Sequence, residues 1–442
     1  VMNRREFLQT VSLAALGASL SAPSAFSQSP RPPSRLIPPD RKLRIAFVGV
    51  GARGYANVKA CASEEIVALC DVDWARAQRT FAEFPHAARY RDYRQMLDEL
   101  DDRIDAVVIS TPDHMHFPPA LLAIERGKHV LVEKPLTHTI GEARILKQAA
   151  AKAGVITQMG NQGHANDGTR LLKEWIEAGV IGPVREVHCW SNRPAWPQGV
   201  PLPPPEPVPA TLDWNLWQGV APERDYSSQI VPFKWRGFWD YGCGALGDMG
   251  CHSLDAPFWA LNLRGPVRVS AVSEGCTAVS APKWSIITYE FPARGSLPPV
   301  KLVWYDGGKL PPVPAELGPD GKLSRGGVLY YGDNGVIMEP GDYGGSPRLI
   351  PAERMQAFTN RPPQTIPRVP GGNSKREWIN ACKGGPLPGS NFVDHAADLT
   401  EMVLLGNVAL RVGQPIDWDP VSLSCVGLPS AGRFIHKHYR QF

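Results

Sequence analysis

Short hydrophobic runs recur through the first third of the chain, and each is followed by a mixed polar segment of helix length. The runs lie at residues 43–48, 66–70, 104–109 and 130–132. A run this short that is hydrophobic on both faces is typical of a buried parallel strand, because helices cover such a sheet on both sides. The crossovers between parallel strands are expected to be right-handed. The pattern therefore predicts an α/β domain of βαβ units over residues 42–160.

After these runs the pattern changes, and a helix expected at 168–178 leads into a second sheet. The strands expected in that sheet are residues 184–190, 300–305, 328–331 and 335–338. An Asp-Asn-Gly turn joins the last two strands, so this sheet is expected to be large, open and mostly antiparallel. A proline-dense loop at 194–209 is long enough to form a lid or a subunit contact. With helices at 374–382 and about 393–412, the pattern predicts an α+β domain over residues 161–442.

The first residues carry an export pattern. NRREFLQ at residues 3–9 resembles the twin-arginine motif, and a mildly apolar stretch at 11–20 follows it. The sequence AFS at 25–27 has small residues at the two positions that a signal peptidase recognises. Residues 1–27 are therefore expected to be a cleaved signal peptide. An amphipathic N-terminal helix is the alternative. Export would place the mature protein in the periplasm or elsewhere outside the cytoplasm, behind a proline-rich arm at 28–41.

Composition narrows the function classes. The length of 442 residues favours two domains, and 43% hydrophobic with 20% charged residues is typical of a soluble globular protein. The net charge of +4 comes without a basic block, so nucleic acid is not an expected partner. No uninterrupted apolar stretch is long enough to predict a permanent membrane span. The eight cysteines show neither CxxC nor Cys/His zinc spacing, so we expect buried thiols and no metal site.

A glycine motif follows the first strand directly. GVGARG begins at Gly49 and opens a helix, which is the context that a dinucleotide-binding Rossmann turn requires. Gly49 permits the tight turn, Gly51 lets the backbone approach a pyrophosphate, and Gly54 allows close helix packing. Asp71 ends the second strand at the distance expected for a contact with the adenosine ribose. A carboxylate there repels a 2′-phosphate, so NAD is favoured over NADP, with a simple turn-forming Asp71 as the alternative.

Two further motifs make a family resemblance specific. STPDHMH starts at Ser110 and GKHVLVEKPL starts at Gly127, in the order and spacing of the glucose-fructose oxidoreductase and inositol dehydrogenase (Gfo/Idh/MocA) family, which the chain resembles over nearly its whole mature length. The resemblance implies that the turn at Thr111 and the following His116 lie near a nicotinamide. It also implies a homo-oligomer, dimer or tetramer, assembled through the open sheet. The cofactor-binding residues expected on these motifs are Gly49, Gly51, Arg53, Gly54, Asp71, Thr111, Pro112, His116, Glu133, Lys134 and Asn161.

A second candidate centre lies in the sequence GCGALGDMGCH, which ends at His252. Its glycines suggest a loop close to a ligand, followed by a helix that starts at Asp248 as N-cap or first-turn residue. Asp248 and His252 are then i,i+4 neighbours, so the carboxylate can orient the imidazole as a general base. The resemblance implies the same Asp-x-x-x-His pattern, with Lys134 polarising the reacting oxygen. A capping aspartate and a structural histidine are the alternative.

Polar and aromatic side chains near both centres suit a sugar. Those expected to bind substrate are Gln162, His164, Trp235, Arg236 and Tyr241. Amides donate and accept hydrogen bonds and aromatic rings stack on sugars, although the aromatic residues could equally fill the inter-domain core. We therefore expect NAD-dependent hydride transfer at a secondary hydroxyl of a sugar or glycoside. The alternatives are a redox-neutral, NAD-dependent glycoside hydrolase and a non-catalytic sugar-binding protein.

Overall fold

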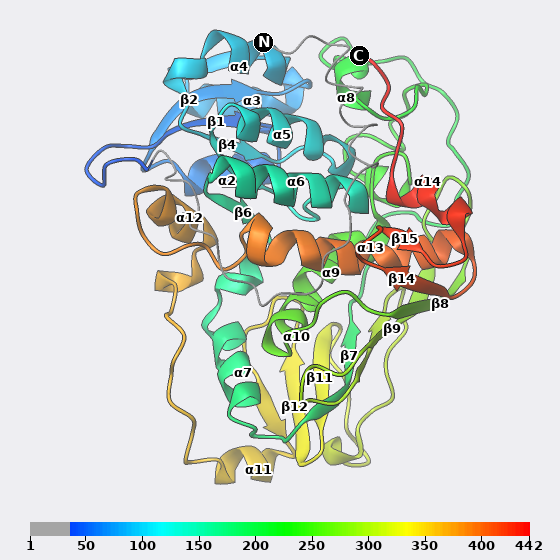
Figure 1. Cartoon of the computed structure of the whole chain (residues 1–442). Coiled ribbons are helices and arrows are strands. Elements are labelled where there is room, and N and C mark those ends of the chain that lie inside the picture. The colour runs from blue at the N-terminus through cyan, green and yellow to red at the C-terminus, as the bar shows by residue number, and fades with distance from the viewer. Residues whose placement is uncertain (1–35) are drawn as a thin grey trace.

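Six parallel strands form the first sheet of the computed structural model, in the order β3-β2-β1-β4-β5-β6 (Figure 1). Their bounds are β1 Arg44–Val48, β2 Glu65–Cys70, β3 Ala88–Tyr90, β4 Ala106–Ile109, β5 His129–Val132 and β6 Thr157–Met159. Val48 pairs with both Cys70 and Ile109, and Ile109 pairs with Val132. These strands therefore end in line, and the residues that follow them meet at one edge. The strand order reverses between β1 and β4, which is where open α/β sheets bind ligands.

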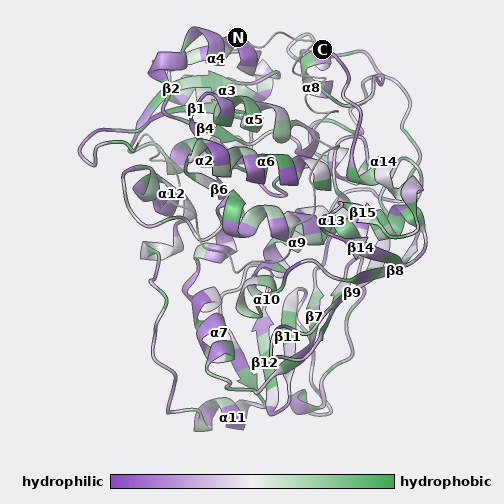
Figure 2. Cartoon of the chain, in the orientation of Figure 1, coloured by the Kyte–Doolittle hydropathy of each residue, from purple (hydrophilic) through white to green (hydrophobic). Residues whose placement is uncertain are grey.

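Helices cover both faces of this sheet. Their bounds are α2 Arg53–Ala60, α3 Trp74–Glu83, α4 Tyr93–Glu99, α5 Phe117–Glu125 and α6 Ile140–Ala153. Alternate residues of each strand point to opposite faces, so Ile45 and Phe47 pack in one hydrophobic cluster while Ala46 and Val48 pack in another. In Figure 2 the strands are largely hydrophobic, whereas α4 at the surface is largely hydrophilic. The predicted α/β domain is confirmed.

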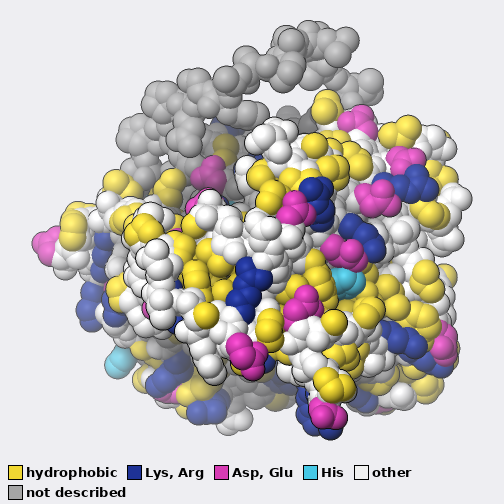
Figure 3. Space-filling view, turned by 90° about the horizontal axis from the view of Figure 1, so that it is seen from below, with side chains coloured by type: hydrophobic (Ala, Val, Ile, Leu, Met, Phe, Trp, Pro, Cys, Tyr) yellow, Lys and Arg dark blue, Asp and Glu magenta, His cyan; other side chains and the backbone are white. Residues whose placement is uncertain are grey.

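Nine strands form the second sheet, in the order β13-β12-β11-β7-β10-β9-β8-β14-β15. Their bounds are β7 Val184–Trp190, β8 Arg268–Glu274, β9 Trp284–Phe291, β10 Val300–Tyr305, β11 Gly327–Gly332, β12 Gly335–Pro340, β13 Arg348–Ile350, β14 Ile416–Asp419 and β15 Ser424–Cys425. Only β7 and β10 pair in parallel, so the predicted mostly antiparallel sheet is confirmed. Seen from below, this part of the molecule shows hydrophobic side chains among charged ones (Figure 3).

The remaining helices join the two sheets. Their bounds are α7 Asp167–Glu177, α8 Trp214–Gln218, α9 Gly244–Ser253, α10 Asp255–Ala260, α11 Ala352–Ala357, α12 Ser374–Cys382, α13 Ala397–Val412 and α14 Gly432–Ile435. Helix α13 is buried almost throughout, and it packs against α6 of the first domain and α9 and β8 of the second. Helix α12 was expected to complete the second domain, but Trp378 and Ile379 pack against Leu43 and Ile45 of the first. The apolar side of α12 joins the hydrophobic cluster on one face of that sheet, a contact that strand and helix patterns alone cannot predict.

The structure describes residues 36–442. The predicted signal peptide at 1–27 and most of the arm at 28–41 lie outside the described residues. The last part of the arm is anchored, because the backbone N–H of Ile37 donates to the carbonyl of Cys382 at the end of α12. Among the helices of the described residues, none combines the length and the hydrophobicity needed to cross a bilayer.

Candidate active site

The backbone after β1 turns too tightly for side chains at two positions. Gly49 has φ +78°, and a Cβ on it would lie 2.8 Å from the carbonyl carbon of Ser110. A Cβ on Gly54 would lie 2.0 Å from the carbonyl oxygen of Gly49. Only glycine therefore fits at both positions. The turn brings the N-terminus of α2 to the edge of the sheet, where its unpaired backbone N–H groups suit a pyrophosphate.

Asp71 lies at the same edge, directly after β2. One of its carboxylate oxygens accepts hydrogen bonds from the backbone N–H of Val50 at 2.8 Å and of Gly51 at 3.2 Å. The other oxygen accepts from the N–H of Asp73 at 2.9 Å, as a turn-forming aspartate does. Asp71 therefore holds the glycine turn and its own turn at once. Burial raises the pKa of this carboxyl, while the backbone N–H groups oppose that rise.

A cleft of about 450 Å³ runs along this edge of the sheet and is closed on its other side by α9 and the segment before it. The predicted site residues that line it are Gly49, Gly51, Arg53, Asp71, Thr111, Pro112, His116, Glu133, Lys134, Gln162, Trp235, Arg236, Asp248 and His252. The structure thus brings together the residues proposed for cofactor binding and those proposed for catalysis.

An ion pair crosses the cleft floor between the two domains. Nζ of Lys134, which follows β5, donates to Oδ1 of Asp248 on α9 at 2.6 Å, and Nε of Arg236 lies 3.5 Å from the same oxygen. Burial alone would lower the pKa of Lys134, but the Asp248 carboxylate raises it above its usual value. Burial alone would raise the pKa of Asp248, but Lys134 and Arg236 hold it below its usual value. Lys134 is therefore a charged donor at neutral pH.

His252 lies one turn further along α9 and is buried. Burial, followed by the positive charge of Lys134, lowers the pKa of His252 to about 3, so the imidazole is neutral at physiological pH. The sequence predicted that Asp248 orients this imidazole. Instead, Asp248 hydrogen-bonds Lys134, and Nδ1 of His252 has no hydrogen-bond partner among the described residues. The ring packs edge-on against Tyr343, with centroids 4.9 Å apart.

Helix α9 starts earlier than the sequence predicted. It begins at Gly244, so Asp248 lies within the helix and is not its cap. The glycines serve packing, because a Cβ on Gly247 would lie 2.1 Å from Cβ of Cys243, and one on Gly250 would lie 3.0 Å from a methyl of Val403 on α13. Glycines lower the helix propensity of this segment, so the sequence alone does not predict a helix here. The close approaches explain why glycines occupy these positions in α9.

Two distant side chains fix the start of α9. Oδ2 of Asp113 accepts from the backbone N–H of Cys243 at 3.0 Å, and Oε1 of Gln198 accepts from that of Ala245 at 3.0 Å. Burial raises the pKa of Asp113, although the nearby His116 and Lys134 oppose the rise. Sequence analysis missed both residues. The STPDHMH motif contains Asp113, but nothing in the sequence pairs it with a helix 130 residues away.

Glu133 and Arg53 form a second ion pair on the cofactor side of the cleft, where Nε of Arg53 lies 2.8 Å from Oε1 of Glu133. Asn57 donates to the same oxygen at 2.9 Å. Burial alone would raise the pKa of Glu133, but Lys375, Arg53 and Lys134 lower it to about 2. This carboxylate therefore balances the positive charges at the ends of β5 and α2.

His116 ties two of the strand-end loops together. Its Nδ1 lies 2.7 Å from the carbonyl oxygen of Pro135, and its Nε2 lies 2.9 Å from that of Thr111. His114 lies between the carbonyls of Trp217 and Tyr241 of the second domain. Burial lowers the pKa of His114 to about 3, so it is neutral there.

Four of the predicted ligand contacts do not line the cleft, namely Gly54, Asn161, His164 and Tyr241. Asn161 is fully buried, and its Oδ1 accepts from the hydroxyl of Ser390 at 2.6 Å. Tyr241 is fully buried against Trp217 and His114, as the core-filling alternative anticipated. His164 is also fully buried. The structure therefore does not bring Asn161, His164 or Tyr241 to the cleft, because tertiary packing turns these side chains toward other partners.

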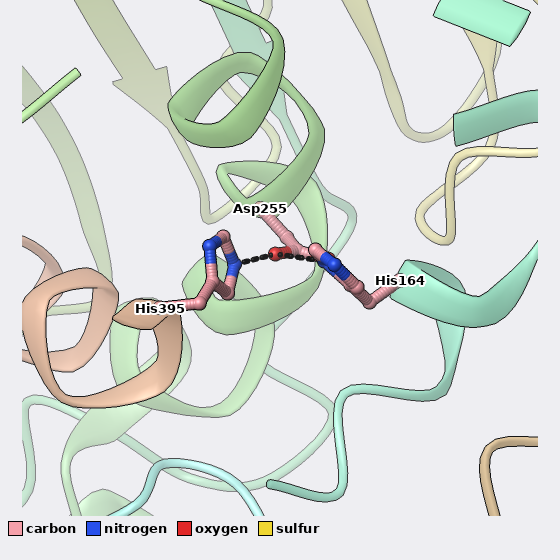
Figure 4. A group of neighbouring side chains, drawn as sticks. All are labelled: His164, Asp255 and His395. Atoms are coloured by element: carbon pink, nitrogen blue, oxygen red, sulfur yellow. Dashed lines mark hydrogen bonds and ion pairs between the residues drawn. The ribbon is translucent and has the colours of Figure 1, made fainter. Parts of the chain in front are cut away.

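His164 belongs to a hydrogen-bonded cluster with Asp255 and His395 (Figure 4). Nδ1 of His164 lies 3.0 Å from Oδ1 of Asp255, and Nε2 of His395 lies 2.5 Å from the same oxygen. Burial alone would raise the pKa of Asp255, but the two histidines hold it well below its usual value. Within residues 36–442 this is the one group of three or more side chains of metal-ligating type whose ligand atoms all lie within 4.8 Å of one another. Here each imidazole contacts the carboxylate directly, and the cluster ties α10 to the turn that precedes α13.

The cleft fits a dinucleotide. The glycine turn leaves backbone exposed where a pyrophosphate needs it, and Asp71 provides a carboxylate at the ribose position twenty residues after Gly51. Arg53, Glu133 and Lys134 would line the nicotinamide half of the bound cofactor. 

Comparisons with known proteins agree with this geometry. Residues 43–161 match the family model described as “Oxidoreductase family, NAD-binding Rossmann fold” of Gfo/Idh/MocA, and residues 171–324 match its “C-terminal alpha/beta domain”. A solved structure of similar fold is the WlbA dehydrogenase from Bordetella pertussis in complex with NADH and UDP-GlcNAcA. It has a TM-score of 0.60 and 19% identity, with 86% of this chain and 99% of that chain covered.

Two curated relatives differ in their named activities. An alpha-N-acetylgalactosaminidase of Shewanella oneidensis is 36% identical over 205 residues, which are 41% of this chain and 44% of that protein. A D-glucoside 3-dehydrogenase of Escherichia coli is 27% identical over 235 residues, which are 52% of this chain and 57% of that protein. The chain thus spans about half the length of the curated relatives it matches.

Proposed function

The chain belongs to the Gfo/Idh/MocA oxidoreductase family, whose Rossmann domain binds NAD, and from this we propose that it transfers a hydride between NAD and a secondary hydroxyl of a sugar or glycoside. The observation that carries the proposal is the arrangement of two side chains. A charged Lys134 and a neutral His252 line the same cleft as the glycine turn.

Each of these side chains has a distinct task. Lys134 donates a hydrogen bond to the reacting oxygen and stabilises the negative charge that grows there as the proton leaves. His252 accepts that hydroxyl proton, which a neutral imidazole can do and an imidazolium cannot. Bound NAD supplies the acceptor for the hydride that leaves the same carbon. The proton on His252 and the hydride together account for the two hydrogens lost when an alcohol becomes a ketone.

Trp235 and Arg236 are the proposed sugar contacts on the second-domain side. The Arg236 guanidinium lies 4.2 Å from the centroid of the Trp235 ring and also reaches Asp248, so both side chains are held in place beside the reacting groups. Gln162 lines the opposite side and accepts from Arg53 at 3.3 Å. A polyhydroxylated ligand can exchange hydrogen bonds with each of these polar groups.

Redox-neutral glycoside hydrolysis is the second candidate, and the similarity to an alpha-N-acetylgalactosaminidase favours it. Oxidation of one hydroxyl acidifies the neighbouring C–H, elimination then expels the aglycone, water adds, and the hydride returns. The same Lys134 and His252 serve both routes, so the cleft alone leaves both open. A non-catalytic sugar-binding protein would have no use for the charged Lys134 beside a neutral base.

One experiment separates these functions. Purified protein is incubated with a panel of glucosides and N-acetylgalactosaminides, with and without added NAD, while NADH absorbance and released aglycone are followed together. Net dehydrogenation gives NADH without aglycone, and the redox-neutral route gives aglycone without NADH. Neither signal on any substrate, although the sugars bind, would contradict both enzymatic proposals. The Lys134→Ala variant is the matched control for background reactions.

We also propose that the enzyme works outside the cytoplasm with tightly retained NAD, as a homo-oligomer. The motif at Arg4 and Arg5 supports export, and free NAD is scarce outside the cell, so a retained cofactor suits a redox-neutral cycle. A change of both arginines to lysine should leave an uncleaved precursor in the cytoplasm. Normal processing of that variant would refute the export proposal, and light scattering of the wild type tests the oligomer.

A further inference from the structure

The chain that follows α14 returns to the first domain and reaches the cleft. Residues 436–442 run from α14 along the edge of the molecule toward α8 (Figure 1, red). Phe442 lines the cleft together with Tyr93, Met115, Pro119 and Trp217. These five side chains come from four separate parts of the chain, and they form an apolar wall.

The strand order shows which end of the cleft this wall covers. Asp71 follows β2, and Lys134 follows β5, three positions away in the sheet. Phe442 is held by Arg94 of α4, which follows β3 at the opposite edge from β5. Because an aspartate at the position of Asp71 contacts the adenosine ribose, Phe442 lies at the adenosine end and away from the reacting groups.

Arg94 holds Phe442 in two ways. Its guanidinium lies over the Phe442 ring, with Cζ 4.4 Å from the centroid, and one of its NH groups donates to the Phe442 carbonyl at 2.8 Å. The same guanidinium forms an ion pair with Asp92 at 2.7 Å, which fixes its plane. The ring is thus positioned by a side chain that is itself anchored.

Upstream contacts attach the segment to both domains. The Tyr439 hydroxyl donates to Glu142 of α6 at 2.7 Å, and Lys437 lies 2.9 Å from the same carboxylate, which is almost fully buried. Arg440 donates to the side chain of Asn215 in α8 at 2.7 Å and to the carbonyl of Ala221 at 3.2 Å. The segment therefore connects the two domains at one end of the cleft.

We propose that residues 436–442 form a strap that retains the dinucleotide, with Phe442 as the contact to its adenosine half. The inference rests on the proposed function only in that the cleft binds NAD(H). A strap tied to both domains at this end of the cleft must move before the adenosine end can leave, and an aromatic ring beside a base adds stacking. The strap therefore slows cofactor release and leaves the chemistry at Lys134 and His252 unchanged.

The test compares Phe442→Ala, Arg94→Ala and a deletion of residues 437–442 with the wild type. The measured quantity is the NAD(H) dissociation rate, by displacement of bound NADH followed by fluorescence, together with the NAD(H) content after desalting. We expect release at least about tenfold faster in each variant. Phe434→Ala is the matched control, because its ring also lies under a guanidinium, 4.2 Å from Arg411, but does not line the cleft.

The outcomes separate the strap from the proposed function. Release that is as slow in folded Phe442→Ala and Arg94→Ala as in the wild type overturns the strap and leaves the proposed function standing. Faster release in the variants supports the strap, whether or not any sugar is oxidised or cleaved. The absence of sugar oxidation and cleavage would overturn the proposed function and leave the strap standing. Should the deletion fail to fold, the two single substitutions decide the question.

Discussion

The two walls of the cleft are built in different ways. The Rossmann wall consists of residues that directly follow strands in register, and their positions depend on backbone turns that the local sequence prescribes. The opposite wall consists of side chains on α9, whose start is fixed by Asp113 and Gln198 from elsewhere in the chain. The positions of the residues on the first wall can therefore be predicted from sequence motifs. Those on the second wall depend on contacts between residues far apart in the sequence. The Lys134–Asp248 ion pair joins the two.

The sharpest way to test this comparison is to remove one reacting group from each wall. Lys134→Ala and His252→Ala should each lower turnover by at least about a hundredfold, the usual contribution of a positioned acid or base, and leave NAD binding intact. The double variant should be only slightly worse than either single one, because the two groups act on one hydroxyl. Steady-state kinetics with NAD titrations measure both. Near-normal turnover of the His252 variant between about pH 6 and 9 would mean that this histidine is structural.

Asp248→Asn removes the charge that joins the walls and keeps the shape. We expect a milder loss, about tenfold, because the reacting groups remain. Without the carboxylate, burial lowers the pKa of Lys134, so the alkaline limb of the pH–rate profile should move to lower pH. Asp240→Asn provides the control, since Asp240 pairs with Arg224 at 3.0 Å and does not line the cleft. An alkaline limb that stays in place would contradict the proposed role of the pair.

A change at the end of β2 on the Rossmann wall should alter cofactor choice. Asp71→Ala removes the carboxylate that repels a 2′-phosphate, and Arg76 and Arg91 line the same end of the cleft. The ratio of NADP to NAD affinity should rise by about tenfold, measured by calorimetry with each cofactor. Asp73→Ala, two residues further on, should change this ratio much less. Tighter binding of NADP than of NAD by the unmodified protein would refute the assignment.

The smallest expected effect concerns His114, which is buried and neutral where the first domain contacts Trp217 and Tyr241 of the second. Its pKa is about 3 in the folded protein and about 6.5 in an unfolded chain. As the pH falls below 6.5, the unfolded chain takes up a proton there and the folded protein does not, so stability decreases. This loss is at most about 2 kcal/mol between pH 7 and 5.

Thermal unfolding at a series of pH values measures this effect. His114→Asn should unfold at a temperature that depends less on pH in this window than that of the wild type. His86→Ala, at an exposed position, is the control and should keep the wild-type dependence. An equal pH dependence in His114→Asn and the wild type would show that this histidine does not contribute to acid destabilisation.

Local sequence signals predicted most of the first domain. Strands that are hydrophobic on both faces, the glycine turn and Asp71 each depend on neighbours within about twenty residues, so their positions follow from the chain itself. The same is true of the hairpin β11–β12 and of the termination of α13 at Gly413, whose left-handed conformation ends a helix. These features need no knowledge of the rest of the fold.

Tertiary structure decided the remainder, because the deciding contacts join residues far apart in sequence. Asp248 could have oriented His252 four residues away, but Lys134, 114 residues away, lies at 2.6 Å and takes the carboxylate. His164 was an equally good candidate for a sugar contact until Asp255 and His395 buried it. Residue types and spacing determine which side chains can reach the cleft. Packing between domains decides which of them face it, since each buried polar group turns toward the partner that best replaces water.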